Sequence, residues 1–131
     1  MPVDALLSLQ STVTKTATFS GAALILPGGT PRRGLKARVF YSAAANATGA
    51  NAVQFSIDVS YDGGVTWNSD FLAPAINLTT TAQSGELAIP FEVSPTSVVN
   101  QIQIRLTSLF GGAGTGPTVT YSSDGVMLAR P

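Results

Sequence analysis

The chain has 131 residues, of which 44% are hydrophobic and 11% are charged, and it contains neither Cys nor His. Seven basic and seven acidic residues give a formal net charge of zero, so no strong attraction to nucleic acid or to an anionic membrane is expected, because both need a basic surplus. The missing residue types exclude a disulfide framework, a thiol nucleophile, the commonest general base and the commonest zinc ligands. This length suits one domain with a core of its own.

Residues 1–11 differ in pattern from the rest of the chain. Val3, Leu6 and Leu7 are spaced as on one face of a helix, and the segment lacks the basic region and long apolar run of a signal peptide. We expect residues 1–11 to form an N-terminal arm or short helix that lies on the chain's own β domain or docks on a neighbouring subunit. A single β-sandwich domain is expected to occupy residues 12–131.

Beyond this segment, apolar and polar residues alternate in short runs that are separated by Gly, Pro, Asn and Asp. Strands are expected over residues 12–20, 22–26, 35–41, 53–61, 65–67, 76–80, 87–93 and 99–108, followed by a hairpin over 119–130 that turns near Asp124-Gly125. Pro90 has no N–H to donate, so its strand is expected to lie at the edge of a sheet or to turn that position outward.

These eight or nine expected strands define an all-β fold, since no segment after residue 11 shows helical periodicity. Their number and turn chemistry predict an antiparallel β-sandwich. The strand count favours a jelly roll. An immunoglobulin-like sandwich is the alternative, although the Cys-Trp-Cys signature of that fold is absent.

The strictest alternation, from Val53 to Tyr61, leads into a turn whose glycines tolerate positive φ and whose Asp can bond its own backbone. The motif residues of this hairpin are Ser60, Asp62, Gly63, Gly64, Thr66 and Trp67. The stretch resembles the Asp-box found on hairpins of sialidase propellers and other β proteins. The resemblance implies a structural hairpin, in which the Asp and the hydroxyls bind turn amides and the Trp packs beneath. A sialidase itself needs several blades, an arginine triad and a tyrosine nucleophile, which one domain cannot hold.

The acidic residues show no arrangement suited to catalysis. Asp58 and Asp62 are four residues apart on one strand and its turn, whereas Glu86 and Glu92 lie on the outward face of another strand. No carboxylate pair is therefore seen to converge on a cleft, and the spacing of the Asp residues matches no calcium-binding loop. We predict a protein that is not an enzyme and that has no catalytic residue, no metal ion and no cofactor.

Two further groups of residues could mediate binding. Four of the seven positive charges predict either a contact patch for an acidic partner or the polar face of an edge strand; they are Arg32, Arg33, Lys36 and Arg38. Three aromatic residues could form a sugar-stacking platform, but their apolar strand positions favour packing in the core or hairpin; they are Tyr41, Tyr61 and Trp67.

Four regions of the chain resemble the small head decoration (cement) proteins of tailed bacteriophages, especially the jelly-roll type of short-tailed phages. They are Met1 to Ser8, Phe55 to Trp67, Gln103 to Thr107 and Val119 to Leu128. The resemblance implies a homodimer or homotrimer that is made in the host cytoplasm and binds the major capsid protein on the capsid exterior of the virion, across joints between coat subunits. The contact residues expected from the sequence are Val3, Leu6, Leu7, Leu9, Arg32, Arg33, Lys36 and Arg38.

The alternative hypothesis is a carbohydrate-binding β-sandwich module of a virion fibre or spike. It rests on the expected sandwich and on Tyr61 and Trp67, which would then contact a glycan. Neither hypothesis has nucleic acid or a membrane as a partner.

Overall fold

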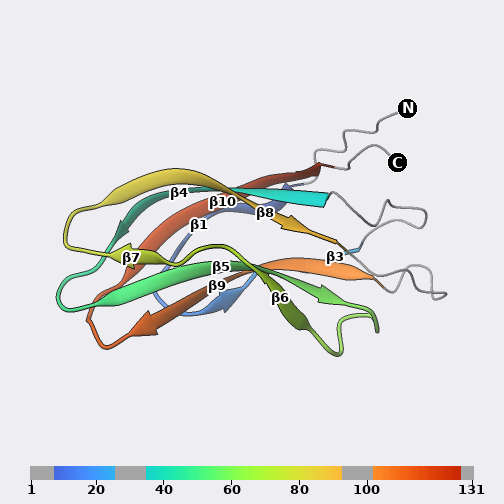
Figure 1. The fold of residues 1–131 in the computed structure, drawn as a ribbon, viewed down its shortest axis with the longest axis horizontal. Helices are drawn as coiled ribbons and strands as arrows, with labels where there is room; N and C mark the ends of the chain where they lie inside the picture. The colour runs from blue at the N-terminus through green and yellow to red at the C-terminus, as the bar shows by residue number, and fades with distance from the viewer. Residues whose placement is uncertain (1–7, 26–34, 93–101, 128–131) are drawn as a thin grey trace.

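The computed structural model describes residues 8–25, 35–92 and 102–127, and within these ranges it contains strands and no helix (Figure 1). The strands are β1 (Ser8–Lys15), β2 (Phe19–Ser20), β3 (Leu24–Ile25), β4 (Leu35–Ala45), β5 (Asn51–Ser60), β6 (Asn68–Leu72), β7 (Ile76–Leu78), β8 (Gln83–Phe91), β9 (Gln103–Gly112) and β10 (Thr118–Met127). Their pairings are antiparallel. The predicted all-β antiparallel sandwich is confirmed.

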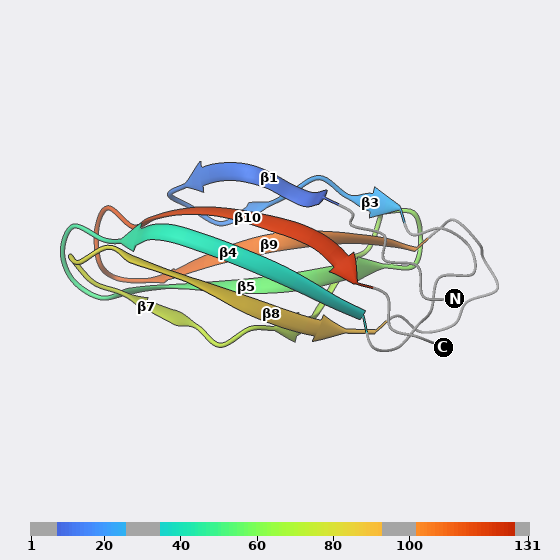
Figure 2. The same cartoon turned by 90° about the horizontal axis from the view of Figure 1, so that it is seen from above.

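Two sheets lie face to face as separate layers (Figure 1), and the view from above has sheet A in front of sheet B (Figure 2). Sheet A has the strand order β1-β10-β4-β8, and sheet B has the order β2-β9-β5-β6, with β3 also paired to β9 and β7 to β5. β1 thus pairs with β10, β2 and β3 pair with β9, and β4 pairs with β8. These pairs are nested like the two arms of one long hairpin that winds around the sandwich. This nested order is that of a jelly roll and not of an immunoglobulin-like sandwich.

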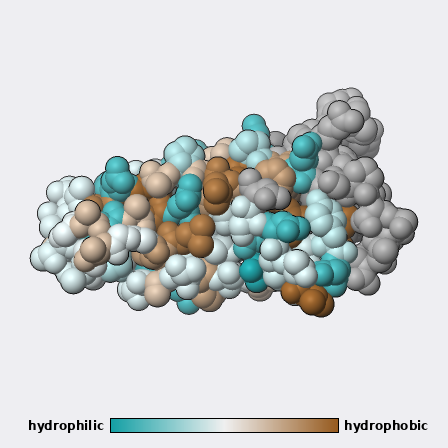
Figure 3. Space-filling model, turned by 60° about the horizontal axis from the view of Figure 1, so that its bottom comes forward, coloured by the Kyte–Doolittle hydropathy of each residue, from teal (hydrophilic) through white to brown (hydrophobic). Residues whose placement is uncertain are grey.

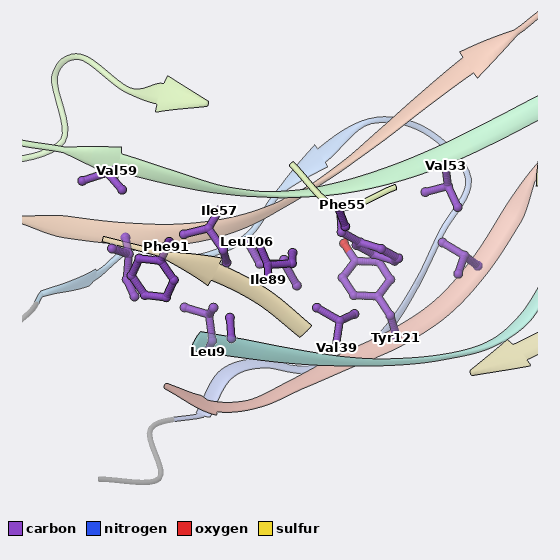
Figure 4. Packing of buried hydrophobic residues seen from close by; sticks show 14 of the residues in the cluster. Leu9, Val39, Val53, Phe55, Ile57, Val59, Ile89, Phe91, Leu106 and Tyr121 are labelled. Atoms are coloured by element: carbon purple, nitrogen blue, oxygen red, sulfur yellow. The ribbon is translucent and has the colours of Figure 1, made fainter. Parts of the chain in front are cut away.

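The hydrophobic core fills the space between the two sheets (Figure 4). Phe55 of β5 meets Tyr121 of β10 edge to face, with ring centroids 5.0 Å apart. The other large side chains that are fully buried are Val39, Val53, Ile57, Val59, Ile89, Ile104, Leu106 and Val119. Burying one such side chain stabilises the fold by about 1.5–3 kcal/mol. The Tyr121 hydroxyl lies 2.9 Å from the Ser108 hydroxyl, and burial raises the pKa of Tyr121.

The sandwich begins earlier than the sequence pattern predicts. β1 starts at Ser8, so residues 8–11 belong to sheet A and not to an arm or helix. Leu9 is 5% exposed and packs in the core, which corrects the expectation that it contacts a partner. Outside the described residues lie the other apolar residues of the predicted arm, Val3, Leu6 and Leu7.

The predicted C-terminal hairpin is wrong. β10 continues through Asp124 and Gly125 as a single strand between β1 and β4. Its pairing with β4 shifts between Ser123 and Val126, so the Asp-Gly pair lies in a bulge and not in a turn.

Two expectations about single strand positions have opposite outcomes. Pro90 was expected on an edge strand, and this is confirmed, because β8 is the last strand of sheet A and Pro90 is exposed on it. Val65 falls within the strand that was expected over residues 65–67, but it lies outside any strand and is 83% exposed. The reason is that β6 begins only at Asn68, so Val65 still belongs to the turn.

Candidate functional site

A buried polar cluster, here called the Asp58 cluster, lies on the outer face of sheet B. The register places Asp58 of β5 opposite Arg105 of β9, and the residues on either side of each point into the core. The Asp58 carboxylate accepts hydrogen bonds from the Arg105 Nε at 3.0 Å and from three hydroxyls, those of Ser56 at 3.0 Å, Ser69 at 2.8 Å and Thr107 at 2.6 Å. Four donors saturate both of its oxygens, so Asp58 has no capacity left to act as a general base or to bind a metal ion.

Trp67 covers this cluster from outside. The guanidinium carbon of Arg105 lies 4.2 Å from the centroid of the Trp67 ring, so Arg105 is held between the indole and the Asp58 carboxylate. The indole N–H donates to the Gly64 carbonyl at 3.1 Å. A cation on the face of a Trp ring contributes about 0.5–1 kcal/mol at a partly exposed site. Trp67 therefore packs on its own hairpin over the outer face of sheet B, which is the hairpin alternative that the sequence pattern left open beside the core.

The three aromatic residues considered for sugar stacking do not share one surface. Tyr41 and Tyr61 are partly buried and pack against the core, and the Tyr41 ring centroid lies 6.5 Å from that of Phe55. Trp67 stands apart from them over Arg105. The structure therefore offers one half-buried indole to a ligand, and not a platform of three rings.

The Asp-box hairpin satisfies its polar groups internally. Asp62 Oδ1 accepts hydrogen bonds from the Ser60 hydroxyl at 2.8 Å and from the backbone N–H groups of Val65 at 3.1 Å and Thr66 at 2.8 Å. The Ser60 hydroxyl oxygen in turn accepts from the Gly64 N–H at 2.8 Å. The hydrogen bond from the Thr66 backbone, and then that from the Ser60 hydroxyl, lower the pKa of Asp62 from 3.8 to about 2. The geometry of the turn thus accounts for these residues without a ligand.

A hollow of about 420 Å³ lies on the outer face of sheet A, and its lining residues are Lys36, Arg38, Glu86, Leu87 and Ala88. Arg38 donates to Glu86 at 3.2 Å, and both side chains are about half exposed. Lys36 is exposed and has no ion pair within the described part of the chain. The structure therefore brings two of the four predicted basic contact residues together at one hollow, whereas Arg32 and Arg33 lie outside the described residues.

Beside the hollow, the outer face of sheet A carries hydroxyls. Thr14 and Thr120 join β1 to β10 through hydroxyls 2.8 Å apart. The register continues this row from Thr120 to Ser42 of β4 and places Ser122 opposite Phe40. Such a surface resembles the centre of a protein interface in one respect, its low content of charge.

The carboxylates considered for catalysis are not brought together. Asp58 belongs to the outer face of sheet B, and Glu86 lies on sheet A, where Arg38 holds it. Within residues 8–25, 35–92 and 102–127, no three acidic side chains are arranged to hold a metal ion. These same ranges contain no helix long and apolar enough to cross a membrane.

The sequence pattern does not reveal the Asp58 cluster as a unit. Its members come from three strands, and the hydrogen bond from Arg105 to Asp58 spans 47 positions of the chain. The available signal was weak: the two most regular strands each carry one outward charge, and the two charges are opposite in sign.

Comparison with known proteins identifies no family. No family model and no curated protein matches the chain. A solved structure described as "CBM4 structure and function" is 16% identical over 86% of this chain, with a TM-score of 0.48, and the chain spans 61% of its length. A structure of TmCBM61 in complex with beta-1,4-galactotriose is 18% identical over 92% of this chain and 69% of its own, with a TM-score of 0.34. Both values describe a partial likeness of the backbone, from which nothing follows about a ligand of this chain.

Proposed function

We propose that this chain is a non-enzymatic structural protein that acts by adhesion of its outer faces. Three observations support the proposal. Asp58 is saturated by four donors, Glu86 is paired with Arg38, and Asp62 is bonded within its own turn. Three of the four carboxylates considered for chemistry thus hold strands and turns together. The outer surfaces of the two sheets are then what the molecule offers a partner.

The partner that we propose is the major capsid protein of a tailed bacteriophage, bound on the outside of the capsid. The observation that carries this proposal is the hollow on sheet A, because the exposed Lys36 and the half-exposed Arg38 meet there beside the hydroxyl row. The four-region resemblance supports it as well, since the jelly roll which that resemblance implies is the fold of this chain. A clamp of this kind needs no reacting group, and several weak contacts on one shell add up through multivalency.

Capsid binding tests this proposal. Capsids of the phage that encodes the chain, prepared without it, are titrated with the wild type and with Lys36→Glu. We expect the variant to bind about tenfold more weakly, because the reversed charge repels the acidic surface that Lys36 attracts. The matched control is Lys15→Glu, which makes the same charge change on β1 and should bind like the wild type. Equal binding of both variants and the wild type would remove the hollow from the contact, and a wild type that does not bind capsids would contradict the proposed function.

A second candidate function, carbohydrate binding, is favoured by Trp67. An indole held in place by Arg105 offers an apolar surface to a sugar ring, and polar side chains beside it could orient the hydroxyls. Ser69 and Gln103 are two such neighbours, since Ser69 bonds Asp58 and Gln103 lies against Gly64 next to the ring. Such a module would serve a virion fibre or spike.

A glycan array distinguishes this second candidate from the first. Sugar-specific binding that is lost in Trp67→Ala, with the melting transition retained, would support carbohydrate recognition. Binding to no glycan at all would remove this candidate and would leave the capsid proposal untouched.

A further inference from the structure

We propose that the hollow on sheet A takes one carboxylate side chain, an Asp or a Glu of its partner, and that Glu86 competes with this guest for the Arg38 guanidinium. The inference rests on the proposed function, because it concerns the same hollow. It deepens that function by naming the chemical group that the hollow binds and a residue of this chain that limits the affinity.

The hollow lies over Ala88 of β8. The outward neighbours of Ala88 along this strand are Glu86 and Pro90, and all three residues are exposed. The methyl group of Ala88 stands between two larger side chains, so it leaves room above the sheet, and it is one of the groups that line the volume of about 420 Å³. A guest side chain can therefore approach the sheet at this position.

Two cations border this room from β4. Lys36 and Arg38 lie on the same face of the strand, since Ala37 between them is fully buried. Arg38 is directly opposite Ala88 in the register, and Lys36 is opposite Pro90, which makes Lys36 a diagonal neighbour of Ala88. Long side chains reach both their direct and their diagonal cross-strand neighbours. Both positive groups can thus meet a carboxylate that is held over Ala88.

The charges that line the hollow are balanced by one anion. Lys36 and Arg38 are positive and Glu86 is negative, which leaves one positive charge in excess. Lys36 is exposed and has no ion pair within the described part of the chain. Glu92 is two positions beyond Pro90 and is not a lining residue. A single guest carboxylate would therefore neutralise the hollow, which is the charge complementarity that interfaces use to select a partner.

Arg38 is held loosely enough to bind a second anion. Its Nη2 donates to Glu86 Oε2 at 3.2 Å, which is longer than the about 2.7–2.9 Å of a tight charge-assisted hydrogen bond. Its guanidinium carbon lies 5.6 Å from the centroid of the Phe40 ring on the same strand. The guanidinium has more N–H donors than this one bond uses, and its planar fork fits a carboxylate.

Glu86 must then oppose the guest. A guest carboxylate either displaces Glu86 from Arg38 or binds beside it, and in both cases the negative charge of Glu86 weakens the binding. The ion pair of Glu86 with Arg38 is about half exposed on both sides, and pairs of this kind are weak. The competition is therefore modest, and removing the charge of Glu86 should strengthen the binding by a small factor.

Sheet B offers no second subsite of this kind among its described residues. Figure 3 turns the side of sheet B toward the viewer and shows hydrophobic residues set among hydrophilic ones. The cation of β9, Arg105, is already bonded to the buried Asp58 and lies against the Trp67 ring. A carboxylate of a partner therefore finds its free cation at the hollow, where Lys36 has no anion.

A peptide titration tests the inference without capsids. The probe is a tetraglutamate peptide with blocked termini, and the backbone amide resonances of isotope-labelled protein are followed by NMR. We expect the resonances of Lys36, Arg38 and Ala88 to shift. In Glu86→Gln the dissociation constant should fall about threefold, because Gln keeps the shape and can still accept from Arg38 but no longer repels the guest.

The matched control is Glu92→Gln. It removes the same charge from the end of the same strand but outside the hollow, so at physiological salt it should bind the peptide nearly like the wild type. On capsids, Glu86→Gln should likewise bind about threefold more tightly than the wild type. The gain should vanish when Glu86→Gln is combined with Arg38→Gln, since the donor for which the two carboxylates compete is then gone.

The possible failures can be told apart. A peptide that shifts none of these resonances would overturn the inference, as would a gain in Glu92→Gln equal to that in Glu86→Gln. Weaker binding by Glu86→Gln would contradict competition and make Glu86 a positioning residue for Arg38. An equal response to inorganic phosphate would show a general anion site in place of a carboxylate site. The expected peptide response from a wild type that does not bind capsids would support the inference and contradict the proposed function alone.

Discussion

Asp58 is 1% exposed although it lies on the outer face of its sheet and carries a charge. A carboxylate in such a position costs several kcal/mol unless hydrogen bonds and an opposite charge offset the lost hydration. Arg105 and three hydroxyls supply that compensation, and the partly exposed Arg105 keeps some contact with water. The Asp58 cluster thus holds Arg105 in place beneath the Trp67 ring on the outer face of sheet B.

Replacing Asp58 by Asn should show this support directly. The amide has nearly the same shape, but it leaves Arg105 without its anion and offers an NH₂ group to donors that need an acceptor. We expect Asp58→Asn to lower the free energy of unfolding by about 2–3 kcal/mol, measured by urea denaturation at neutral pH. Glu86→Gln removes the exposed ion pair with Arg38 and should cost less than about 1 kcal/mol. Equal losses in the two variants would contradict the role given to the cluster.

Asp62 should give the fold a pH dependence in the acidic range. Its folded pKa of about 2 lies below the ordinary value of 3.8, so its ionised form stabilises the turn. That contribution is complete above about pH 4 and is lost as the pH falls through about 2. We therefore expect wild type and Asp62→Asn to differ most in unfolding free energy at neutral pH, with the difference shrinking below about pH 4. Urea denaturation at a series of pH values measures it, and a difference that stays constant with pH would show that the charge is not the cause.

At the scale of the strands, the alternation of apolar and polar residues correctly predicted which side chains of β5 and β9 point into the core. β5 and β9 were expected over residues 53–61 and 99–108, and their described inward positions are buried and apolar except Ser108, whose hydroxyl meets that of Tyr121. The Asp124-Gly125 pair misled the prediction because a bulge and a hairpin turn use the same residue types. What keeps β10 extended there is its position between β1 and β4, and no local pattern contains that information.

The candidate surfaces were harder to predict than the strands, for the same reason. Lys36 and Arg38 could be singled out because they alternate along one strand and point outward. The pairing of Asp58 with Arg105 depends on the register between β5 and β9, where a slip by one residue would turn each side chain to the other face. Register of distant strands is set by the whole core, so the sequence could suggest the two charges but not their contact.

The end of β9 offers a matched pair of glycines for testing how closely it packs on the loop before β5. Gly112 has a φ of +100°, and a Cβ there would collide with the Ala50 carbonyl oxygen, whereas a Cβ on Gly111 would meet open space. We expect Gly112→Ala to cost about 2 kcal/mol or more, and Gly111→Ala to change stability by less than about 1 kcal/mol. Thermal denaturation followed by circular dichroism compares them, and similar melting temperatures would show that the loop moves aside.

At the scale of the whole molecule, the jelly-roll topology pairs the first described strand, β1, with the last one, β10. β1 covers one edge of β10, and Leu9 closes the core beneath it. The two outer faces then differ in character, with a basic hollow and hydroxyls on sheet A and the polar Asp58 cluster under Trp67 on sheet B.

This topology also decides how the N-terminal segment should be tested. Deleting residues 1–10 removes the pairing of Ser8 and Gln10 with β10 together with the buried Leu9, so we expect a loss of about 2–5 kcal/mol in unfolding free energy. Weaker capsid binding by that variant would then reflect a damaged sandwich as readily as a missing contact. Deleting residues 1–7 leaves β1 complete, so its melting temperature should match that of the wild type, and its retention on capsids tests the segment alone. If the longer deletion melted like the wild type, residues 8–10 would contribute nothing to stability, and Leu9 would again be a candidate contact residue.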